Sequence, residues 1–227
     1  MHNFALPEPL LKSVLQRTGK RHPFDEIDPG RTALLVIDMQ NYFCAPGYMG
    51  EVPMARAIVP DINRLAASLR AAGGHVVWIK GSSDGTAETW PVFNNYLMTP
   101  DRRRRRFETL SESHEGHQLW PELIVEPDDT HVVKKRFSAF LQGSSDIDAH
   151  LRRMSIDTLL IAGTTTDVCC DSSARDAAML NYKVTMVADA NATYSDAAHN
   201  AALAAFYNVF GDVQTVDEVI GYLGAAK

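Results

Sequence analysis

The chain has few cysteines, and their spacing does not suggest that they pair. Cys44, Cys169 and Cys170 are the three cysteines among 227 residues. An odd number of this kind provides no disulfide framework and is typical of reduced thiols. The cysteines are also too few and too poorly spaced to form a zinc site. We therefore expect a cytoplasmic protein.

The sequence also lacks a membrane-spanning segment, a signal peptide and a nucleic-acid-binding pattern. No apolar run reaches the roughly 18 residues that a membrane-spanning helix needs, and the N-terminus lacks the apolar core of a signal peptide. The formal net charge of −6 argues against general nucleic-acid binding, and no glycine-rich phosphate loop occurs. We expect neither a membrane nor a nucleic acid as a partner.

Short apolar runs that alternate with helical patterns are what the sequence does contain. The runs carry almost no charge, so they are typical of strands that are buried on both faces of a parallel sheet. We predict an α/β protein with three layers, α/β/α, around a six-stranded, mainly parallel sheet. The predicted strands are 33–37, 75–80, 132–133, 158–162, 184–188 and 213–216. The predicted helices are 54–72, 146–154, 195–207 and a closing helix that ends near 223.

Two further divisions follow from the same patterns. Residues 1–30 are predicted to be an N-terminal extension with a short amphipathic helix, and residues 31–227 to be the main domain. Residues 39–43 are predicted to form a loop, and residues 81–130 a long irregular section.

Two polar motifs within residues 81–130 invite a ligand-binding interpretation. Arg102–Arg106 is a run of five arginines, but acidic residues flank it, so we interpret it as a solvated or intersubunit face. His114 and His117 enclose a glutamate as in a zinc helix, but they are three residues apart, and a metalloprotease needs four. We predict no metal site here.

Three ionisable residues fall at the C-terminal ends of predicted strands: Asp38, Lys134 and Cys169. Ligands of open parallel sheets bind outside these ends, so the three side chains are expected to converge. Each has a plainer interpretation, as a turn cap, a surface lysine or a small buried hydrophobe. Cys169 also precedes a helical pattern, and a helix N-terminus favours the reactive thiolate.

Here the sequence resembles a known family. The segments ALLVIDMQNYF, VVKKRFSAF and LLIAGTTTDVCC, and more weakly KVTMVADANATYSDAAHNAAL, are similar to motifs of the isochorismatase-like cysteine hydrolases. The resemblance covers about residues 31–222 and is nearest to the branch of N-carbamoylsarcosine amidases and ureidoacrylate amidohydrolases. It implies the isochorismatase-like hydrolase fold for the main domain.

The resemblance implies that Asp38, Lys134 and Cys169 form an Asp–Lys–Cys catalytic triad. It favours Lys134 over Lys135 because the family lysine stands six residues before a phenylalanine, here Phe140.

The same resemblance favours Cys169 over Cys170, because the family nucleophile follows a Gly-x-x-Thr-x-x segment, here residues 163–168. It also implies an oxyanion hole made of the Thr165 and Cys169 N–H groups, and a cis peptide bond between Thr164 and Thr165.

The implied reaction is covalent hydrolysis without a cofactor. Asp38 takes the thiol proton, Lys134 stabilises the charge, and the thiolate attacks an amide or ureide carbonyl. The leaving amine receives the proton, and water then hydrolyses the thioester.

Two comparisons with branches of the family narrow the choice of reaction. Nicotinamidase-type members carry an Asp-x-His metal motif where residues 81–86 have no histidine, and true isochorismatases lack the cysteine. We therefore predict a hydrolase of non-peptide C–N bonds that releases ammonia from a small carbamoyl, ureido or primary amide substrate. An isochorismatase-type hydrolase and a catalytically inactive binding or scaffold homologue stay open as alternatives.

Aromatic and amide residues are expected to shape the substrate pocket. The predicted pocket residues are Phe43, Trp90, Asn94, Gln118 and Phe137, with Phe93, Asn95 and Tyr96 as further candidates. The protein is expected to be a homo-oligomer, a dimer or a tetramer.

Overall fold

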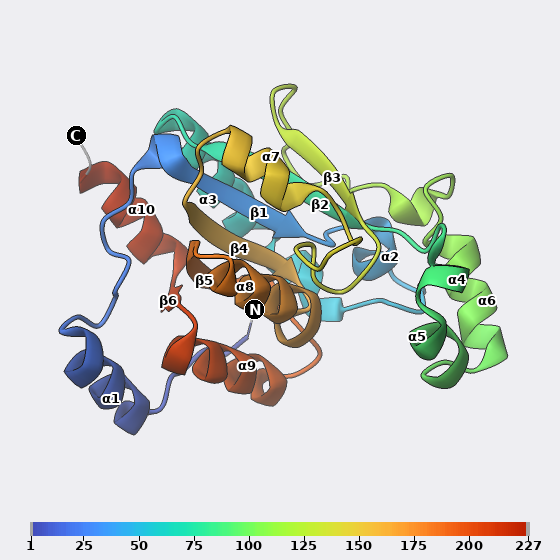
Figure 1. Cartoon of the computed structure of the whole chain (residues 1–227), viewed down its shortest axis with the longest axis horizontal. Helices are drawn as coiled ribbons and strands as arrows, with labels where there is room; N and C mark the ends of the chain where they lie inside the picture. Colours follow the sequence, from blue (N-terminus) through green and yellow to red (C-terminus); the bar gives the residue numbers. More distant parts are fainter. Residues whose placement is uncertain (1, 226–227) are drawn as a thin grey trace.

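A six-stranded sheet with helices on both faces forms the centre of the molecule (Figure 1). The computed structural model describes residues 2–225. The strand order is β3-β2-β1-β4-β5-β6, and every neighbouring pair is parallel. The predicted three-layer α/β/α architecture is therefore confirmed, and the sheet is parallel throughout. The strands are β1 (Thr32–Ile37), β2 (His75–Gly81), β3 (Thr130–Lys134), β4 (Thr158–Thr164), β5 (Lys183–Ala192) and β6 (Asp212–Gln214).

The side chains of β1 show why the sheet needs cover on both faces. Leu35 and Ile37 belong to one buried apolar cluster, whereas Leu34 and Val36 belong to the other. Successive side chains of a strand point to opposite faces, and each such side chain contributes about 1.5–3 kcal/mol when it is buried. The first cluster is covered by α7 (Ile147–Arg153), α8 (Asp171–Met179) and α9 (Asp196–Val209), and the second by α3 (Val59–Ala71) and α10 (Val216–Ala225).

The strand order reverses between β1 and β4. The chain first builds outward from β1 to β3 and then returns to place β4 against β1, where Ile37 pairs with Gly163. Gly163 has φ +117°, and a Cβ there would lie 2.1 Å from the Ile37 carbonyl oxygen, so only glycine fits. The segments that leave the two strands therefore emerge side by side, where ligands of such sheets bind.

The prediction of an irregular section over residues 81–130 is wrong for residues 86–109. This region contains α4 (Thr86–Thr89), α5 (Pro91–Tyr96) and α6 (Pro100–Thr109), which lie together beyond the carboxyl ends of the strands (Figure 1). The sequence of α6 has no apolar periodicity, so its helix signals are local ones. Thr99 caps its first turn by accepting a hydrogen bond from the Arg102 N–H, and Pro100 stands at its first position.

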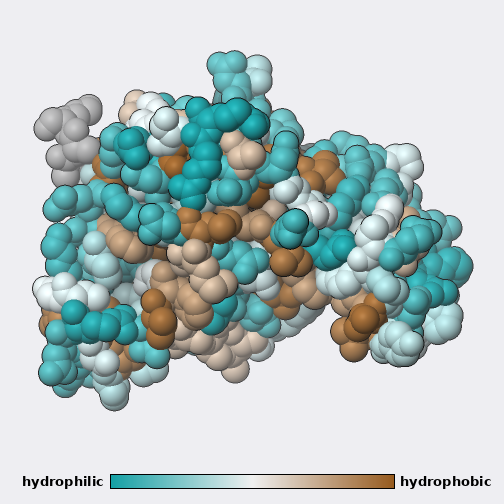
Figure 2. Space-filling model, viewed as in Figure 1, coloured by the Kyte–Doolittle hydropathy of each residue, from teal (hydrophilic) through white to brown (hydrophobic). Residues whose placement is uncertain are grey.

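Smaller corrections apply elsewhere in the chain. The predicted loop at 39–43 contains the short helix α2 (Asn41–Cys44), and the helix predicted from residue 54 begins as a 3-10 turn, Pro53–Ile58. On the surface, Figure 2 shows hydrophobic residues near α5, where Val92 within the helix and Leu97 directly after it are exposed.

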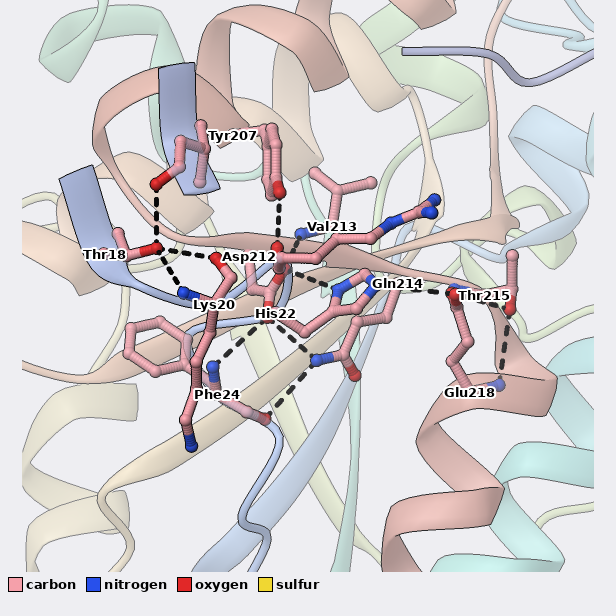
Figure 3. Close-up of polar contacts among 12 residues, drawn as sticks. Thr18, Lys20, His22, Phe24, Tyr207, Asp212, Val213, Gln214, Thr215 and Glu218 are labelled. Atoms are coloured by element: carbon pink, nitrogen blue, oxygen red, sulfur yellow. Dashed lines mark hydrogen bonds and ion pairs between the residues drawn. The ribbon is translucent and has the colours of Figure 1, made fainter. Parts of the chain in front are cut away.

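The N-terminal segment is packed against the main part of the molecule. Helix α1 (Glu8–Thr18) lies against α9, and Val14 is fully buried. Further along, His22 and the Phe24 N–H contact the carboxylate of Asp212 (Figure 3). The division at residue 30 stays a prediction. Among residues 2–225 no helix is both long and apolar enough to cross a membrane.

Candidate active site

Asp38 and Lys134 meet at the point where the strand order reverses. Asp38 follows β1 directly with φ +56°, and Lys134 ends β3. Asp38 Oδ2 lies 2.8 Å from Lys134 Nζ, and the side chains are 1% and 3% exposed. Apart from this ion pair, neither carboxylate oxygen has a hydrogen-bond partner within residues 2–225. A buried carboxylate with unused acceptor capacity is suited to receive a proton.

A glycine leaves room for this carboxylate. A Cβ at Gly81, the last residue of β2, would lie 3.1 Å from Asp38 Oδ1. Gln40 fixes the neighbouring backbone, because its side chain accepts from the Gly81 N–H and donates to the Gly81 carbonyl.

Cys169 completes this buried group. It lies in a single π-helical turn, Thr166–Cys170, which leads from β4 into α8. Burial, followed by the charge of Asp38, raises the pKa of the Cys169 thiol to about 12, and Lys134 opposes the shift. The pKa is thus raised, whereas the helix end was expected to favour the thiolate: burial beside a carboxylate disfavours the charged form of the thiol. At neutral pH Cys169 is therefore a thiol, and the carboxylate beside it is that of Asp38.

Lys134 keeps its charge in this environment. Burial alone would lower the pKa of Lys134, but Asp38 and then Cys169 outweigh it, so the pKa is raised. The ammonium also donates to the Arg136 carbonyl oxygen at 3.1 Å. A fixed positive charge beside the sulfur is suited to stabilise the thiolate once the proton has moved to Asp38.

The turn that carries Cys169 is held by its backbone. The Thr165 carbonyl oxygen accepts from the Val168 and Cys170 N–H groups, at 3.2 and 3.1 Å. The Thr164–Thr165 peptide bond is cis, as the resemblance implied. Thr165 and Cys169 both line the same cavity, so their N–H groups stay our proposed oxyanion donors.

A cavity of about 320 Å³ opens onto these side chains. Asp38, Lys134 and Cys169 line it, and so do two predicted pocket residues, Phe43 and Phe137. A volume of this size is suited to a small molecule.

The other three predicted pocket residues do not line this cavity. Trp90 stacks on Phe93 with ring centroids 4.3 Å apart, and Phe93, not Trp90, lines the cavity. Asn94 is buried with its Nδ2 bonded to the Thr86 carbonyl oxygen, and Gln118 is exposed. Residue type suggested these positions, but side-chain direction follows from the packing of α5 and the neighbouring turns.

Two cavity residues were missed because they belong to the arginine run. Arg102 and Arg106 line the cavity, although the run was interpreted as a solvated or intersubunit face. Their spacing of four residues places them on one face of α6, and this spacing was the available signal. Cys170 is fully buried behind the site, with its sulfur 4.0 Å from the Ala162 carbonyl oxygen.

The fold and the site together define a class of protein. A buried cysteine beside an Asp–Lys ion pair, at the reversal point of a parallel sheet, is the arrangement of a cysteine hydrolase. The model of the isochorismatase domain matches residues 32–218. The chain therefore belongs to the isochorismatase family of hydrolases, and the predicted family is confirmed.

Individual relatives agree with this assignment. The ureidoacrylate amidohydrolase RutB of Pseudomonas syringae pv. syringae is 32% identical over an alignment of 206 residues, and the alignment covers 84% of this chain and 82% of the relative. A probable inactive nicotinamidase of Arabidopsis thaliana is 31% identical over 189 residues, 82% of this chain and 93% of that protein. The crystal structure of a cysteine hydrolase from Pseudomonas syringae pv. phaseolicola has a TM-score of 0.79 at 30% identity, covering 88% of this chain and 96% of the other.

No cluster of metal ligands accompanies the site. Within the part of the chain that the structure describes, no three His, Cys, Asp or Glu side chains gather closely enough to hold a metal ion.

Proposed function

We propose that the protein is a cysteine amidohydrolase that cleaves the C–N bond of a small carbamoyl, ureido or primary amide compound and releases ammonia. The observation that carries the proposal is the buried Cys169 thiol beside the Asp38–Lys134 ion pair, at the base of a cavity that fits a small molecule. A thiol with a raised pKa needs an adjacent base, and Asp38 is that base.

The proposed reaction returns every group to its starting state. Asp38 takes the Cys169 proton, and the sulfur attacks the carbonyl carbon while the Thr165 and Cys169 N–H groups hold the oxyanion. Asp38 then gives the proton to the departing nitrogen, so ammonia leaves and a thioester remains. Water, deprotonated by Asp38, attacks the thioester, and the proton returns to the sulfur as the acid is released. Lys134 stabilises each negative charge.

The relatives support this proposal unequally. The similarity to a ureidoacrylate amidohydrolase supports C–N cleavage of a ureide. The similarity to a probable inactive nicotinamidase keeps an inactive binding homologue as the second candidate. The complete Asp38, Lys134 and Cys169 set favours the enzyme, because a binding protein has no need of a buried lysine beside a thiol. A cytoplasmic location and a homo-oligomeric state stay predictions.

An ammonia-release assay over a panel of small ureides, carbamoyl compounds and primary amides tests the proposal. We expect turnover of at least one compound by the wild-type protein, none by Cys169→Ala, and unchanged turnover after exhaustive chelation. Release of ammonia by Cys169→Ala would contradict the mechanism. Turnover of isochorismate with no amide hydrolysed would contradict the assigned reaction.

A further inference from the structure

Residues 2–5 lie against the edge of the sheet that holds the active site. Strand β5 ends at Ala192, and its carboxyl end is on that edge. The His2 side chain is buried there and is only 3% exposed. Its Nδ1 donates to the Asp196 carboxylate at 2.7 Å, and its Nε2 accepts from the Thr193 N–H at 3.0 Å. His2 is therefore fixed to the connection between β5 and α9 (Figure 1).

The residues after His2 continue this contact along α9. The Asn200 side chain donates to the Asn3 carbonyl oxygen at 3.0 Å and accepts from the Ala5 N–H at 3.2 Å. The Phe4 ring lies edge-on to His199, and Phe4 packs against the apolar cluster that contains Cys169. Both the backbone and the side chains of residues 2–5 are thus used in contacts with this helix.

A first route leads from His2 to the π-helical turn Thr166–Cys170. His2 stacks on His199 with ring centroids 4.4 Å apart and 21° between the ring planes. His199 is fully buried, and its Nδ1 shares a hydrogen bond of 2.9 Å with the hydroxyl of Thr166, the first residue of the turn. Burial, and then the charge of His2, lowers the pKa of His199 to about 4, so the ring is neutral at pH 7. Its Nε2 has no hydrogen-bond partner within residues 2–225, so the Thr166 bond sets the rotation of the ring.

A second route reaches the same turn through Thr193. The Thr193 hydroxyl donates to the Asp167 carboxylate at 2.6 Å, and Asp167 is the second residue of the turn. His2 holds the Thr193 backbone, and the next residue, Tyr194, lines the active-site cavity. The two routes start at one side chain and end at neighbouring residues, Thr166 and Asp167, so a rotation of the turn would strain both.

The π-helical turn needs external support because its geometry is uncommon. Single π-helical turns are rare and occur frequently at functional sites. This one carries Cys169, whose proton can move to Asp38 only while the two side chains stay within hydrogen-bond reach. A misplacement of about 1 Å in such a group can reduce a rate by about 100-fold.

We propose that residues 2–5 are a positioning element of the active site, in which His2, through His199 and Thr193, holds the turn that places Cys169 beside Asp38. The catalytic consequence rests on the proposed function, whereas the position of the sulfur can be measured without a substrate. His2 does not line the cavity, so it is a positioning residue and not a catalytic one.

Loss of the His2 contacts should displace the turn while the protein stays folded. His2→Leu keeps an apolar side chain but removes the ring stack and both hydrogen bonds. We expect kcat for ammonia release to fall by about 10- to 100-fold. His2→Gln, which can still donate to Asp196 and accept from the Thr193 N–H, should recover part of this loss.

Alkylation of Cys169 provides a measurement that needs no substrate. The rate of reaction with iodoacetamide is followed over a range of pH, and tandem mass spectrometry of the peptide distinguishes Cys169 from Cys170. The wild-type thiol, whose pKa is raised to about 12, should react slowly at pH 8. A displaced thiol is less buried and farther from Asp38, so in His2→Leu its pKa should fall toward about 8.5 and its rate at pH 8 should rise by at least about 10-fold.

His22→Gln is the matched control. It removes another contact between a histidine of the N-terminal segment and a carboxylate, that of Asp212. Asp212 begins β6, so this contact lies at the opposite edge of the parallel sheet. In urea unfolding His22→Gln should be less stable than wild type, as His2→Leu should be, but its kcat and the alkylation profile of Cys169 should be unchanged.

A second pair of variants tests the link from His199 to the turn. Thr166→Val removes the hydroxyl with nearly the same shape, whereas Thr166→Ser keeps it. We expect only Thr166→Val to speed the alkylation of Cys169. This pair decides the question if His2→Leu fails to fold.

An unchanged alkylation profile in both His2→Leu and Thr166→Val would overturn the proposal, and so would the same change in Thr166→Ser as in Thr166→Val. If the profile shifts as expected but no amide is hydrolysed by the wild-type protein, only the proposed amidohydrolase function fails.

Discussion

Two buried carboxylates in this molecule have opposite surroundings. Asp212 begins β6 and is fully buried, and Asp38 follows β1 and is 1% exposed. Asp212 accepts from four donors at 2.8–3.2 Å (Figure 3): His22 Nδ1, the N–H groups of Phe24 and Val213, and Gln214 Nε2. Asp38 has the Lys134 ion pair and no further partner within residues 2–225.

The difference distinguishes a carboxylate that stabilises the fold, Asp212, from one that is free to take part in a reaction, Asp38. A buried carboxylate whose oxygens are all occupied ties segments together, here the N-terminal segment and β6. A buried carboxylate with free acceptor capacity is costly to fold, and such groups are retained where a proton or a substrate must be received. Arg106, which lines the same cavity as Asp38, is a cation of this kind, because its buried Nη1 atom has no hydrogen-bond partner among residues 2–225.

The largest effect should come from removing the Cys169 thiol, which lies beside Asp38. We expect Cys169→Ala to reduce kcat/KM for any amide substrate by at least about 10⁴-fold, because the covalent route is lost. Cys170→Val is the matched control, since its sulfur faces the Ala162 carbonyl, and it should retain most activity. Full activity in Cys169→Ala together with its loss in Cys170→Val would move the nucleophile by one residue.

The next effect concerns the ion pair itself. Replacing both partners, Asp38→Asn with Lys134→Met, should reduce kcat/KM by at least about 10³-fold, because the base and the fixed charge are removed together. The free energy of unfolding should change by less than about 1 kcal/mol, since neutral replacement of a buried pair is often tolerated. Activity assays and urea unfolding measure the two quantities. If the double variant lost as much free energy of unfolding as it lost in transition-state stabilisation, the contrast drawn between Asp38 and Asp212 would be contradicted.

The reverse result is expected for Asp212. We expect Asp212→Asn to lower the free energy of unfolding by about 3 kcal/mol, because it removes the charge that its four donors surround. The kcat/KM should stay within about 3-fold of wild type, because Asp212 is not part of the cavity lining. A stable but inactive Asp212→Asn protein would show that this cluster serves catalysis.

A smaller, pH-dependent effect should appear at His22. Burial alone would lower the pKa of His22, but the hydrogen bond and charge of Asp212, with Glu218, outweigh it and raise the pKa. Because the pKa is higher in the folded state, this contact stabilises fully below the unfolded pKa of about 6.5 and is lost as pH rises through the folded value. The difference in unfolding free energy between wild type and His22→Gln should therefore shrink from pH 6 to pH 8.5. A constant difference over this range would contradict the charged contact.

Much of the fold was predictable because its signals are local. The apolar runs of the strands, and the polar residues that end them, placed Asp38, Lys134 and Cys169 at one edge of a parallel sheet. In the structure Asp38 and Lys134 are in contact there, and Cys169 lies against them. The sheet order that makes these ends adjacent is a consequence of long-range pairing, which the pattern of each single strand does not contain.

What could not be predicted depends on how helices pack against the sheet. Helix α6 has no apolar face, so hydrophobic periodicity could not reveal it, and Arg106 was assigned to a solvated or intersubunit face. Trp90 and Asn94 have the residue types of a pocket, but their side chains turn toward Phe93 and Thr86. The state of the Cys169 thiol depends on burial and on Asp38, which the helix-end argument alone could not include.

Direct observation of an acyl group on Cys169 tests the central claim of this account. A slowly hydrolysed amide or ureide is mixed with the protein, quenched rapidly in acid and analysed by intact mass spectrometry followed by peptide mapping. We predict a mass increase equal to the acyl part of the substrate, located on Cys169, and no such increase in Cys169→Ala. Turnover without an adduct under these conditions, or an adduct on Cys170, would contradict the account.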